Sequence, residues 1–246
     1  MGRRRADMLL VERGLAESRE QARRLIMGGR VRSGTVTLVQ PATLLKEGAS
    51  LEVLEPEPYV SRGGHKLEAA LSTFKLSVEG VTALDVGAST GGFTDCLLQS
   101  GASSVIAIDV GRAQLHAKLR GDDRVTLLER TNARNLPDVG PFDLFVVDVS
   151  FISLKKILPA IAFRAIPRTP GVVLLKPQFE AGPADVPRGG VIKDEGVRTR
   201  VVADLRNWLA VKGWSVLDLI ECPLRGGDGN VEYLVWLETP NRGTDA

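Results

Sequence analysis

From residue 67 onward, short apolar runs alternate with longer segments in which apolar residues recur every three or four positions. The short runs predict β-strands at 83–85, 105–109, 125–129, 144–148, 172–176, 214–219 and 231–237. The periodic segments predict helices at 67–74, 93–98, 114–120, 154–166 and 194–212. Alternating strands and helices favour a mostly parallel sheet with helices on both faces. We therefore expect an α/β fold for this part of the chain.

The last part of this pattern differs in two ways. The final two strands are joined by Leu224–Asn230, a glycine-rich connection that is short enough for an antiparallel hairpin, so one antiparallel strand is expected. Between Pro177 and Asp194 the chain is rich in glycine and proline. This segment is long enough to form a lid or an arm that contacts a substrate.

The first 54 residues predict a small, separate α+β domain. Asp7 is placed to cap a short helix, and Ser18 with Gln21 matches the capping box of a second helix. Residues 31–54 predict short strands joined by tight turns.

Two prolines in Glu55–Pro58 favour an extended linker between the two domains. The expected organisation is a domain over residues 1–56, a linker over 57–62 and a second domain over 63–242.

Composition and charge narrow the possible functions. No apolar run approaches the roughly 18 residues that a membrane span needs, and the N-terminus lacks the apolar core of a signal peptide, so we expect a cytoplasmic protein without membrane contact. The only cysteines, Cys96 and Cys222, lie far apart, and the chain has two histidines, so no metal site is expected. The net charge of +2 conceals nine arginines within residues 1–32, a concentration that suits phosphate binding but also suits a solvated face.

The segment after the first predicted strand is the strongest motif of the chain. Asp85 closes the strand, and Gly87, Gly91 and Gly92 follow in a turn that leads into a helix. Dinucleotide-binding dehydrogenases have a different glycine spacing, which leaves a dehydrogenase as the weaker alternative to a methyl-donor site. A second strand ends in Asp109, where a carboxylate can accept hydrogen bonds from ribose hydroxyls.

Four charged residues are expected to meet beside this loop. Asp148 and Lys176 each end a buried strand, at the sheet edge where open α/β folds bind ligands. Glu232 begins the antiparallel strand and should lie at the same edge. Lys66 lies in the first turn of a helix, where the helix dipole disfavours a cation, so a functional reason for its position is expected.

The N-terminal segment resembles the small RNA-binding domain first recognised in ribosomal small-subunit protein four, through Leu9–Gly14, Leu15–Ala22, Leu25–Ile26, Gly29–Val31 and Gly48–Val53. The alternative is a small helical oligomerisation module. The resemblance implies that the arginines of this domain contact structured RNA; these are Arg3, Arg4, Arg19, Arg23, Arg24 and Arg30.

The set Lys66, Asp148, Lys176 and Glu232 resembles that of FtsJ-type 2′-O-ribose methyltransferases, and with the first domain the whole chain resembles the hemolysin A (TlyA) family. This implies a Rossmann-like methyltransferase fold, S-adenosylmethionine as cofactor, and ribosomal RNA within a ribosomal subunit as partner. The acceptor would be a cytidine ribose, in the large subunit rather than the small, because the chain ends soon after its last strand as shorter members do. The implied cofactor-binding residues are Asp85, Gly87, Ala88, Ser89, Gly91, Gly92, Phe93, Asp109, Thr131 and Asn132.

The proposed reaction needs alignment of the two substrates and help in removing the 2′-hydroxyl proton. Burial would make Lys176 a usable base, whereas nearby Asp148 and Glu232 would keep it a cation that stabilises an alkoxide. The sequence leaves both roles open, and it does not define the oligomeric state. The other hypotheses are an RNA-binding assembly factor with a vestigial pocket, and a pore-forming hemolysin, for which no membrane-length segment was found.

Overall fold

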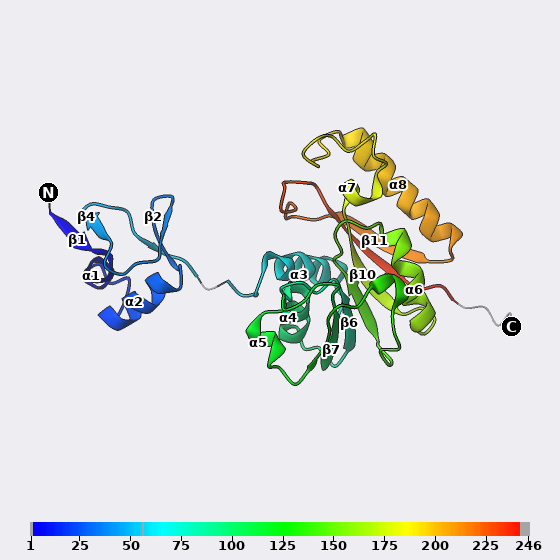
Figure 1. Cartoon of the computed structure of the whole chain (residues 1–246), viewed down its shortest axis with the longest axis horizontal. Coiled ribbons are helices and arrows are strands. Elements are labelled where there is room, and N and C mark those ends of the chain that lie inside the picture. Colours follow the sequence, from blue (N-terminus) through cyan, green and yellow to red (C-terminus); the bar gives the residue numbers. More distant parts are fainter. Residues whose placement is uncertain (1, 56, 242–246) are drawn as a thin grey trace. The chain divides into compact units, whose positions relative to one another are not determined.

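The computed structural model describes residues 2–55 and 57–241, so the expected domain limits at 1, 56 and 242 fall outside the described chain. The chain divides into two compact units, Met1–Pro58 and Tyr59–Ala246, which are described separately (Figure 1). Tyr59 and Val60, which lie in the expected linker, pack against a core of the second unit. No helix in the described ranges is long and apolar enough to cross a membrane.

The first unit contains two short helices and two small antiparallel sheets. The helices are α1 (Ala6–Glu12) and α2 (Arg19–Met27). The strands are β1 (Arg3–Arg5), β2 (Val31–Ser33), β3 (Val36–Leu38), β4 (Leu44–Lys46) and β5 (Glu52–Val53). One sheet has the order β3–β2–β5 and the other pairs β1 with β4. Leu10, Ile26 and Val31 pack together in the core, as expected for an α+β domain.

The structure corrects the role of Asp7. Helix α1 begins after Arg5, which provides no side-chain cap, whereas Asp7 lies within the first turn and is fully buried. Its carboxylate accepts two hydrogen bonds from Arg5, both 2.9 Å, and one from Nε of Arg19 at 3.1 Å. The bond from Arg5 is the largest cause that lowers the pKa of Asp7 to about 2. The expected cap at Ser18 is confirmed, because its hydroxyl accepts the N–H of Gln21.

The second unit is built on a seven-stranded sheet. Its strands are β6 (Thr82–Val86), β7 (Ser104–Ile108), β8 (Val125–Leu128), β9 (Leu144–Val147), β10 (Pro170–Leu175), β11 (Ser215–Glu221) and β12 (Tyr233–Glu238). They lie in the order β11–β12–β10–β9–β6–β7–β8. Strand β12 runs antiparallel to both of its neighbours, and the pairs among β10, β9, β6, β7 and β8 are parallel. The prediction of a mostly parallel sheet with one antiparallel strand is confirmed.

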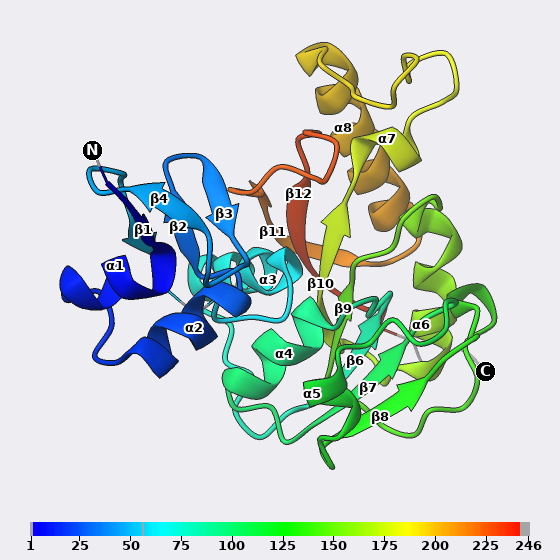
Figure 2. The ribbon, with the colours of Figure 1, turned by 60° about the vertical axis from the view of Figure 1, so that its left-hand side comes forward.

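Alternating side chains build two cores, one on each face of this sheet. Figure 2 shows the sheet together with the helices that flank it. One face packs against α3 (Arg62–Phe74), α4 (Gly92–Gln99) and α5 (Ala117–Arg120). The other packs against α6 (Leu158–Arg164) and α8 (Glu195–Val211). On β6, for example, Ala83 faces the first group and Leu84 the second.

Three segments differ in detail from the predicted elements. Helix α5 begins only at Ala117, because the His116 side chain caps it by accepting the N–H of Lys118. The segment at 154–166 is a 3₁₀ helix, η2 (Leu154–Lys156), followed by α6 with a proline in its first turn. The Gly- and Pro-rich segment after β10 begins with a short helix, α7 (Pro177–Glu180). A further 3₁₀ helix, η1 (Ala133–Asn135), precedes β9.

Candidate active site

The loop after β6 is fixed by close packing between protein segments. Gly87 has φ +90°, and a Cβ at this residue would lie 2.4 Å from the backbone oxygen of Asp148. A Cβ at Gly91, which has φ +97°, would lie 2.3 Å from the side chain of Leu119. Both positions therefore require glycine, because neighbouring protein atoms occupy the space that a Cβ would need and because φ is positive. Our expectation was that these glycines admit a ligand, and the structure shows an additional and sufficient reason for them.

Asp85 lies beneath this loop and lines neither of the two cavities described below. It is fully buried and accepts a hydrogen bond from the Thr94 hydroxyl at 2.6 Å. Its Oδ1 atom has no hydrogen-bond partner among the described residues. Burial, helped by the charges of Asp148 and Asp109, raises the pKa of Asp85 to about 7. The position of Asp85 suits support of the loop from below.

Asp109 follows β7 and lies on the wall of a cavity of about 470 Å³, which we call the Asp109 cavity. One carboxylate oxygen accepts the N–H of Ser89 at 2.8 Å, and the other accepts the N–H of Gly111 at 2.6 Å. These bonds fix the carboxylate, and each oxygen keeps a further lone pair for a ligand. Thr131 and Asn132, two further residues of the predicted set, also line this cavity.

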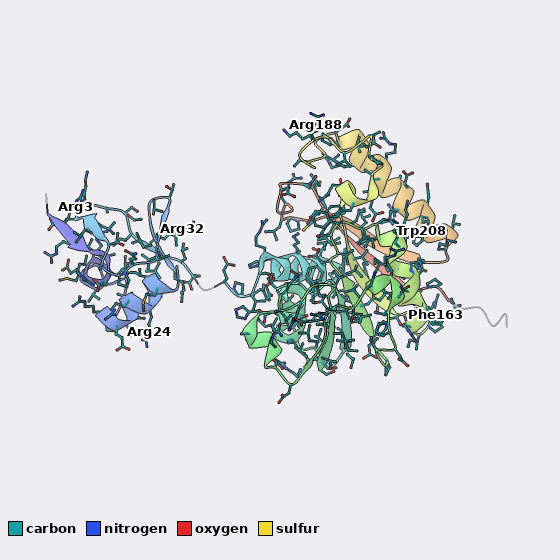
Figure 3. All side chains as sticks on the ribbon, viewed as in Figure 1. Arg3, Arg24, Arg32, Phe163, Arg188 and Trp208 are labelled. Atoms are coloured by element: carbon teal, nitrogen blue, oxygen red, sulfur yellow. The ribbon has the colours of Figure 1, made fainter. Side chains whose placement is uncertain are left out.

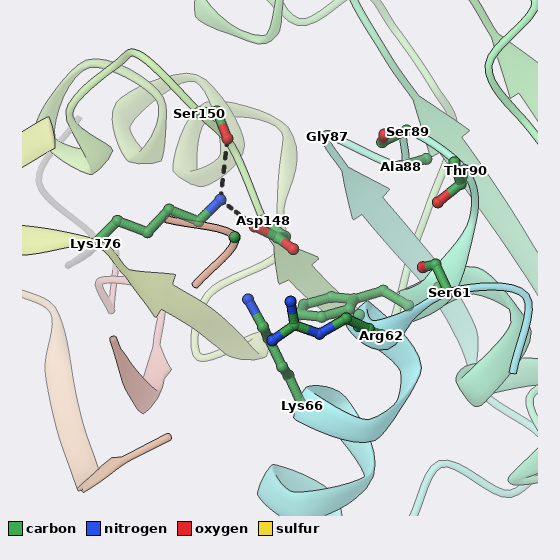
Figure 4. Close-up of a pocket in the computed structure, with 14 residues that line it drawn as sticks. Ser61, Arg62, Lys66, Gly87, Ala88, Ser89, Thr90, Asp148, Ser150 and Lys176 are labelled. Atoms are coloured by element: carbon green, nitrogen blue, oxygen red, sulfur yellow. Dashed lines mark hydrogen bonds and ion pairs between the residues drawn. The ribbon is translucent and has the colours of Figure 1, made fainter. Parts of the chain in front are cut away.

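A second cavity of about 350 Å³, which we call the lysine cavity, lies beside the first. Figure 4 shows the side chains of Lys66 and Lys176 reaching it from α3 and from the end of β10. Gly87, Ser89, Asp148 and Ser150 line both cavities, so the two cavities adjoin along a shared wall. Ala88, Gly92 and Phe93 of the predicted set also line the lysine cavity, whereas Gly91 lines neither.

Each of the two lysines is paired with an acid. The Nζ atom of Lys176 lies 2.6 Å from Oδ1 of Asp148 and donates a hydrogen bond of 3.1 Å to Ser150 (Figure 4). The Nζ atom of Lys66 lies 2.5 Å from Oε2 of Glu232. Both lysines are only 8% exposed and Glu232 only 2%. Buried charges of this kind are retained only when a partner compensates them.

The structure thus brings all four predicted charged residues to one sheet edge, although Glu232 reaches the cavity only through Lys66. The placement of Lys66 in the first helical turn was wrong, because α3 begins at Arg62 and Lys66 is its fifth residue. Pairing with Glu232 explains its position instead.

Several cavity residues were missed from the sequence. Ser150 and Phe151 lie two and three residues after Asp148, so the carboxyl end of β9 was a usable signal for both. Phe151 is 90% exposed and has φ +64°, which is unusual for a bulky residue. Arg62 also lines the lysine cavity and donates to the backbone oxygen of Arg225 at 2.7 Å. No local sequence signal pointed to that contact.

The segment from Ala181 to Asp194, which we call the arm, is anchored beside Glu232. Asn230 is 2% exposed; its amide oxygen accepts the N–H of Ile192 at 3.0 Å, and its amide nitrogen donates to Gly190 at 2.9 Å. Arg188 extends from the arm to the surface (Figure 3). The arm is thereby tied to the connection between β11 and β12.

The arginines of the first unit differ in how free they are. Arg19 pairs with Asp7, and Arg30 donates twice to the backbone oxygen of Leu54. Arg4 and Arg24 pair with Glu12 and Glu20 at the surface. Arg3 and Arg23 are exposed and form no ion pair within residues 2–55; Figure 3 labels Arg3, Arg24 and Arg32 on this unit. Of the six predicted arginines, Arg3 and Arg23 therefore remain the most available for an external anion.

The strand order, the glycine loop and the two lysine–acid pairs define a Rossmann-like methyltransferase. Residues 59–239 match the model of the FtsJ-like methyltransferase family, and residues 4–51 match the S4 domain. The chain belongs to the TlyA family of FtsJ-like methyltransferases with an N-terminal S4 domain.

Three similar proteins illustrate this relationship. The chain is 47% identical to the 16S/23S rRNA (cytidine-2′-O)-methyltransferase TlyA of Mycobacterium tuberculosis, over 96% of this chain and 90% of that protein. It is 36% identical to the 23S rRNA (cytidine-2′-O)-methyltransferase TlyA of Campylobacter jejuni, over 78% and 76%. A solved hemolysin-type protein of Streptococcus thermophilus is 42% identical, with a TM-score of 0.74, over 98% of this chain and 90% of that one.

Proposed function

We propose that this protein uses S-adenosylmethionine to methylate the 2′-oxygen of a cytidine ribose in ribosomal RNA of the large subunit. Two of its relatives bear the name of a cytidine-2′-O-methyltransferase, and both names include 23S RNA. The first unit, which contains the S4 domain, supplies the exposed arginines Arg3 and Arg23 for the RNA backbone. A ribosomal substrate would place the protein in the cytoplasm.

The residues of the two cavities fit this cofactor. The fixed carboxylate of Asp109 can accept ribose hydroxyls, and Ile108, Val110 and Ile152 offer apolar surface for an adenine ring. The glycine loop leads from this wall toward the lysine cavity. When bound, S-adenosylmethionine supplies a methyl group on a positively charged sulfur, which is a strong electrophile.

The paired lysines carry the rest of the chemistry. Oδ1 of Asp148 lies 2.6 Å from Nζ of Lys176, so an acid is placed to compensate a positive charge on this lysine. We assign Lys176 the role of stabilising negative charge on the 2′-oxygen as the hydroxyl proton passes to solvent. Lys66, held by Glu232, adds positive potential to the same cavity. These cations favour the entry of an RNA strand, whose backbone is anionic.

The observation that carries this proposal is the placement of two buried, acid-paired lysines next to the Asp109 cavity. The test incubates the full chain with methyl-labelled S-adenosylmethionine and isolated large or small ribosomal subunits, then maps the labelled nucleotide. We expect label on a cytidine 2′-oxygen of the large subunit, and loss of labelling in Lys176→Ala but not in Lys212→Ala, an exposed lysine after α8. Cofactor binding without any labelled RNA would refute the proposed acceptor.

A further inference from the structure

The carboxylate and the hydroxyl that contact Lys176 come from the same irregular segment. Asp148 and Ser150 both lie between β9 and η2, in residues 148–153, which we call the β9 loop. Lys176 directly follows β10, the strand that pairs with β9. The geometry around its Nζ atom therefore depends on how the β9 loop is held against the segment that follows β10.

Glu180 connects the segment after β10 to the C-terminal end of the β9 loop. It is the last residue of α7, four residues after Lys176. Its Oε2 atom accepts a hydrogen bond from the Ser153 hydroxyl, and its Oε1 atom accepts the N–H of Leu154, both at 2.6 Å. Both carboxylate oxygens are thus used to hold the end of the β9 loop and the start of η2. Glu180 lines neither the Asp109 cavity nor the lysine cavity.

The part of the β9 loop between these contacts is strained. Phe151 has φ +64°, a conformation that persists only when its surroundings hold it. Its ring lies 5.0 Å from that of Phe179, which belongs to α7. Without the bonds to Glu180, the loop could relax at Phe151. Ser150, the adjacent residue, would then move away from Lys176.

We propose that Glu180 is a positioning residue that holds the β9 loop so that Asp148 and Ser150 stay in contact with Lys176. This inference rests on the proposed role of Lys176 in methyl transfer. If Glu180 merely capped η2, its loss would lower stability without acting through the lysine. A positioning role requires that its effect depend on the presence of Lys176.

The first test compares single-turnover methyl transfer to large subunits at saturating S-adenosylmethionine. We expect Glu180→Ala to react between about ten and a hundredfold more slowly, because small displacements of reacting groups cost factors of this size. Glu180→Gln should be intermediate, since its amide oxygen can still accept the N–H of Leu154. Cofactor affinity should stay within about twofold, because Glu180 lines neither cavity.

The matched control is Asp143→Ala, which removes a carboxylate that accepts the backbone N–H of Thr82 at the opposite edge of the sheet. It should leave the rate unchanged. In a Lys176→Ala background, Glu180→Ala should slow the residual reaction by less than about twofold, because the effects of substitutions at residues that act as a unit do not add. An equal loss in both backgrounds, or no loss in either, would overturn the proposal.

A second measurement does not depend on activity. With ¹³C- and ¹⁵N-labelled lysine, the side-chain resonance of Lys176, assigned by its loss in Lys176→Arg, reports the surroundings of its Nζ atom. We expect this resonance to shift in Glu180→Ala, to stay near its wild-type position in Glu180→Gln and to stay unchanged in Asp143→Ala. An unchanged resonance in Glu180→Ala would refute the positioning role, even if the acceptor proposed above were wrong.

Discussion

Lys66 and Glu232 are 166 residues apart in the sequence, yet their side chains form a hydrogen-bonded ion pair of 2.5 Å. The pair connects α3 with the residue that precedes β12, and both side chains are buried. It therefore joins the helix that covers one face of the sheet to the antiparallel strand. This contact serves stability and the charge of the lysine cavity at the same time.

Removal of one partner of this pair should be costly. Glu232→Ala leaves the Lys66 ammonium buried without its acid, and we expect a loss of about 3–5 kcal/mol in the free energy of unfolding. The double variant Lys66→Met with Glu232→Leu should recover most of that stability but not methyl transfer. Denaturant unfolding and the labelling assay test both statements. Equal stability of Glu232→Ala and the wild type would contradict them.

Lys176→Arg separates the two possible roles of this residue. Arginine keeps the positive charge next to Asp148 but cannot act as a base. If Lys176 stabilises charge, the arginine variant should retain a measurable single-turnover rate, whereas Lys176→Ala should be slower than the wild type by about 10²–10³-fold. An arginine variant as inactive as the alanine variant would count against the cationic role.

Asp109→Ala should weaken the binding of S-adenosylmethionine. The loss of a charged acceptor is expected to cost about 1.5–3 kcal/mol, measured by calorimetry. Asp109→Asn is the control, because it keeps an oxygen that can accept the N–H of Ser89 or Gly111 and so preserves part of the loop geometry. Unchanged affinity in the alanine variant would remove Asp109 from the cofactor site.

Asp85→Asn should stabilise the protein at alkaline pH. The folded-state pKa of Asp85 is raised to about 7, so the folded protein favours the protonated form and loses stability as the pH rises from the unfolded-state pKa toward 7. The ionised carboxylate then costs at most about 4 kcal/mol, since each pKa unit corresponds to about 1.4 kcal/mol. Asparagine cannot ionise and still accepts the Thr94 hydroxyl. Thermal unfolding should show the gain at pH 8 and little gain at pH 4.

Arg23→Ala should reduce the salt dependence of RNA binding. Arg23 is exposed and has no ion pair within residues 2–55, so it is available to a phosphate. Loss of one phosphate contact lowers the slope of log affinity against log salt by about 1. Arg19→Ala is the comparison, because it also removes a partner of buried Asp7 and should destabilise the first unit. An unchanged slope in Arg23→Ala would exclude a phosphate contact at this residue.

The fold could be predicted because its signals are local. Apolar runs such as 144–148 and the alternation of strands with helices determine the parallel sheet, and the strand ends place Asp148 and Lys176 at one edge. The convergence of Glu232 followed from the antiparallel direction of β12. These inferences need only the direction of each strand.

Other features depend on contacts between distant segments and could not be inferred. The partners of Asp7 are Arg5, which precedes α1, and Arg19, which begins α2. Its burial results from the packing of these separate segments, which a local capping pattern does not show. The hydrogen bonds that Ser153 and Leu154 donate to Glu180 bridge two segments separated by α6 and β10. The start of α5 was also predicted wrongly: periodicity placed it at residue 114, whereas His116 caps a helix that begins at Ala117.

The backbone oxygen of Asp148 occupies the space that a side chain at Gly87 would need. A substitution at Gly87 would therefore push the loop after β6 away from Asp148, the acid that pairs with Lys176. Because this contact links the two segments, a lasting sequence change in one of them requires a compensating change in the other.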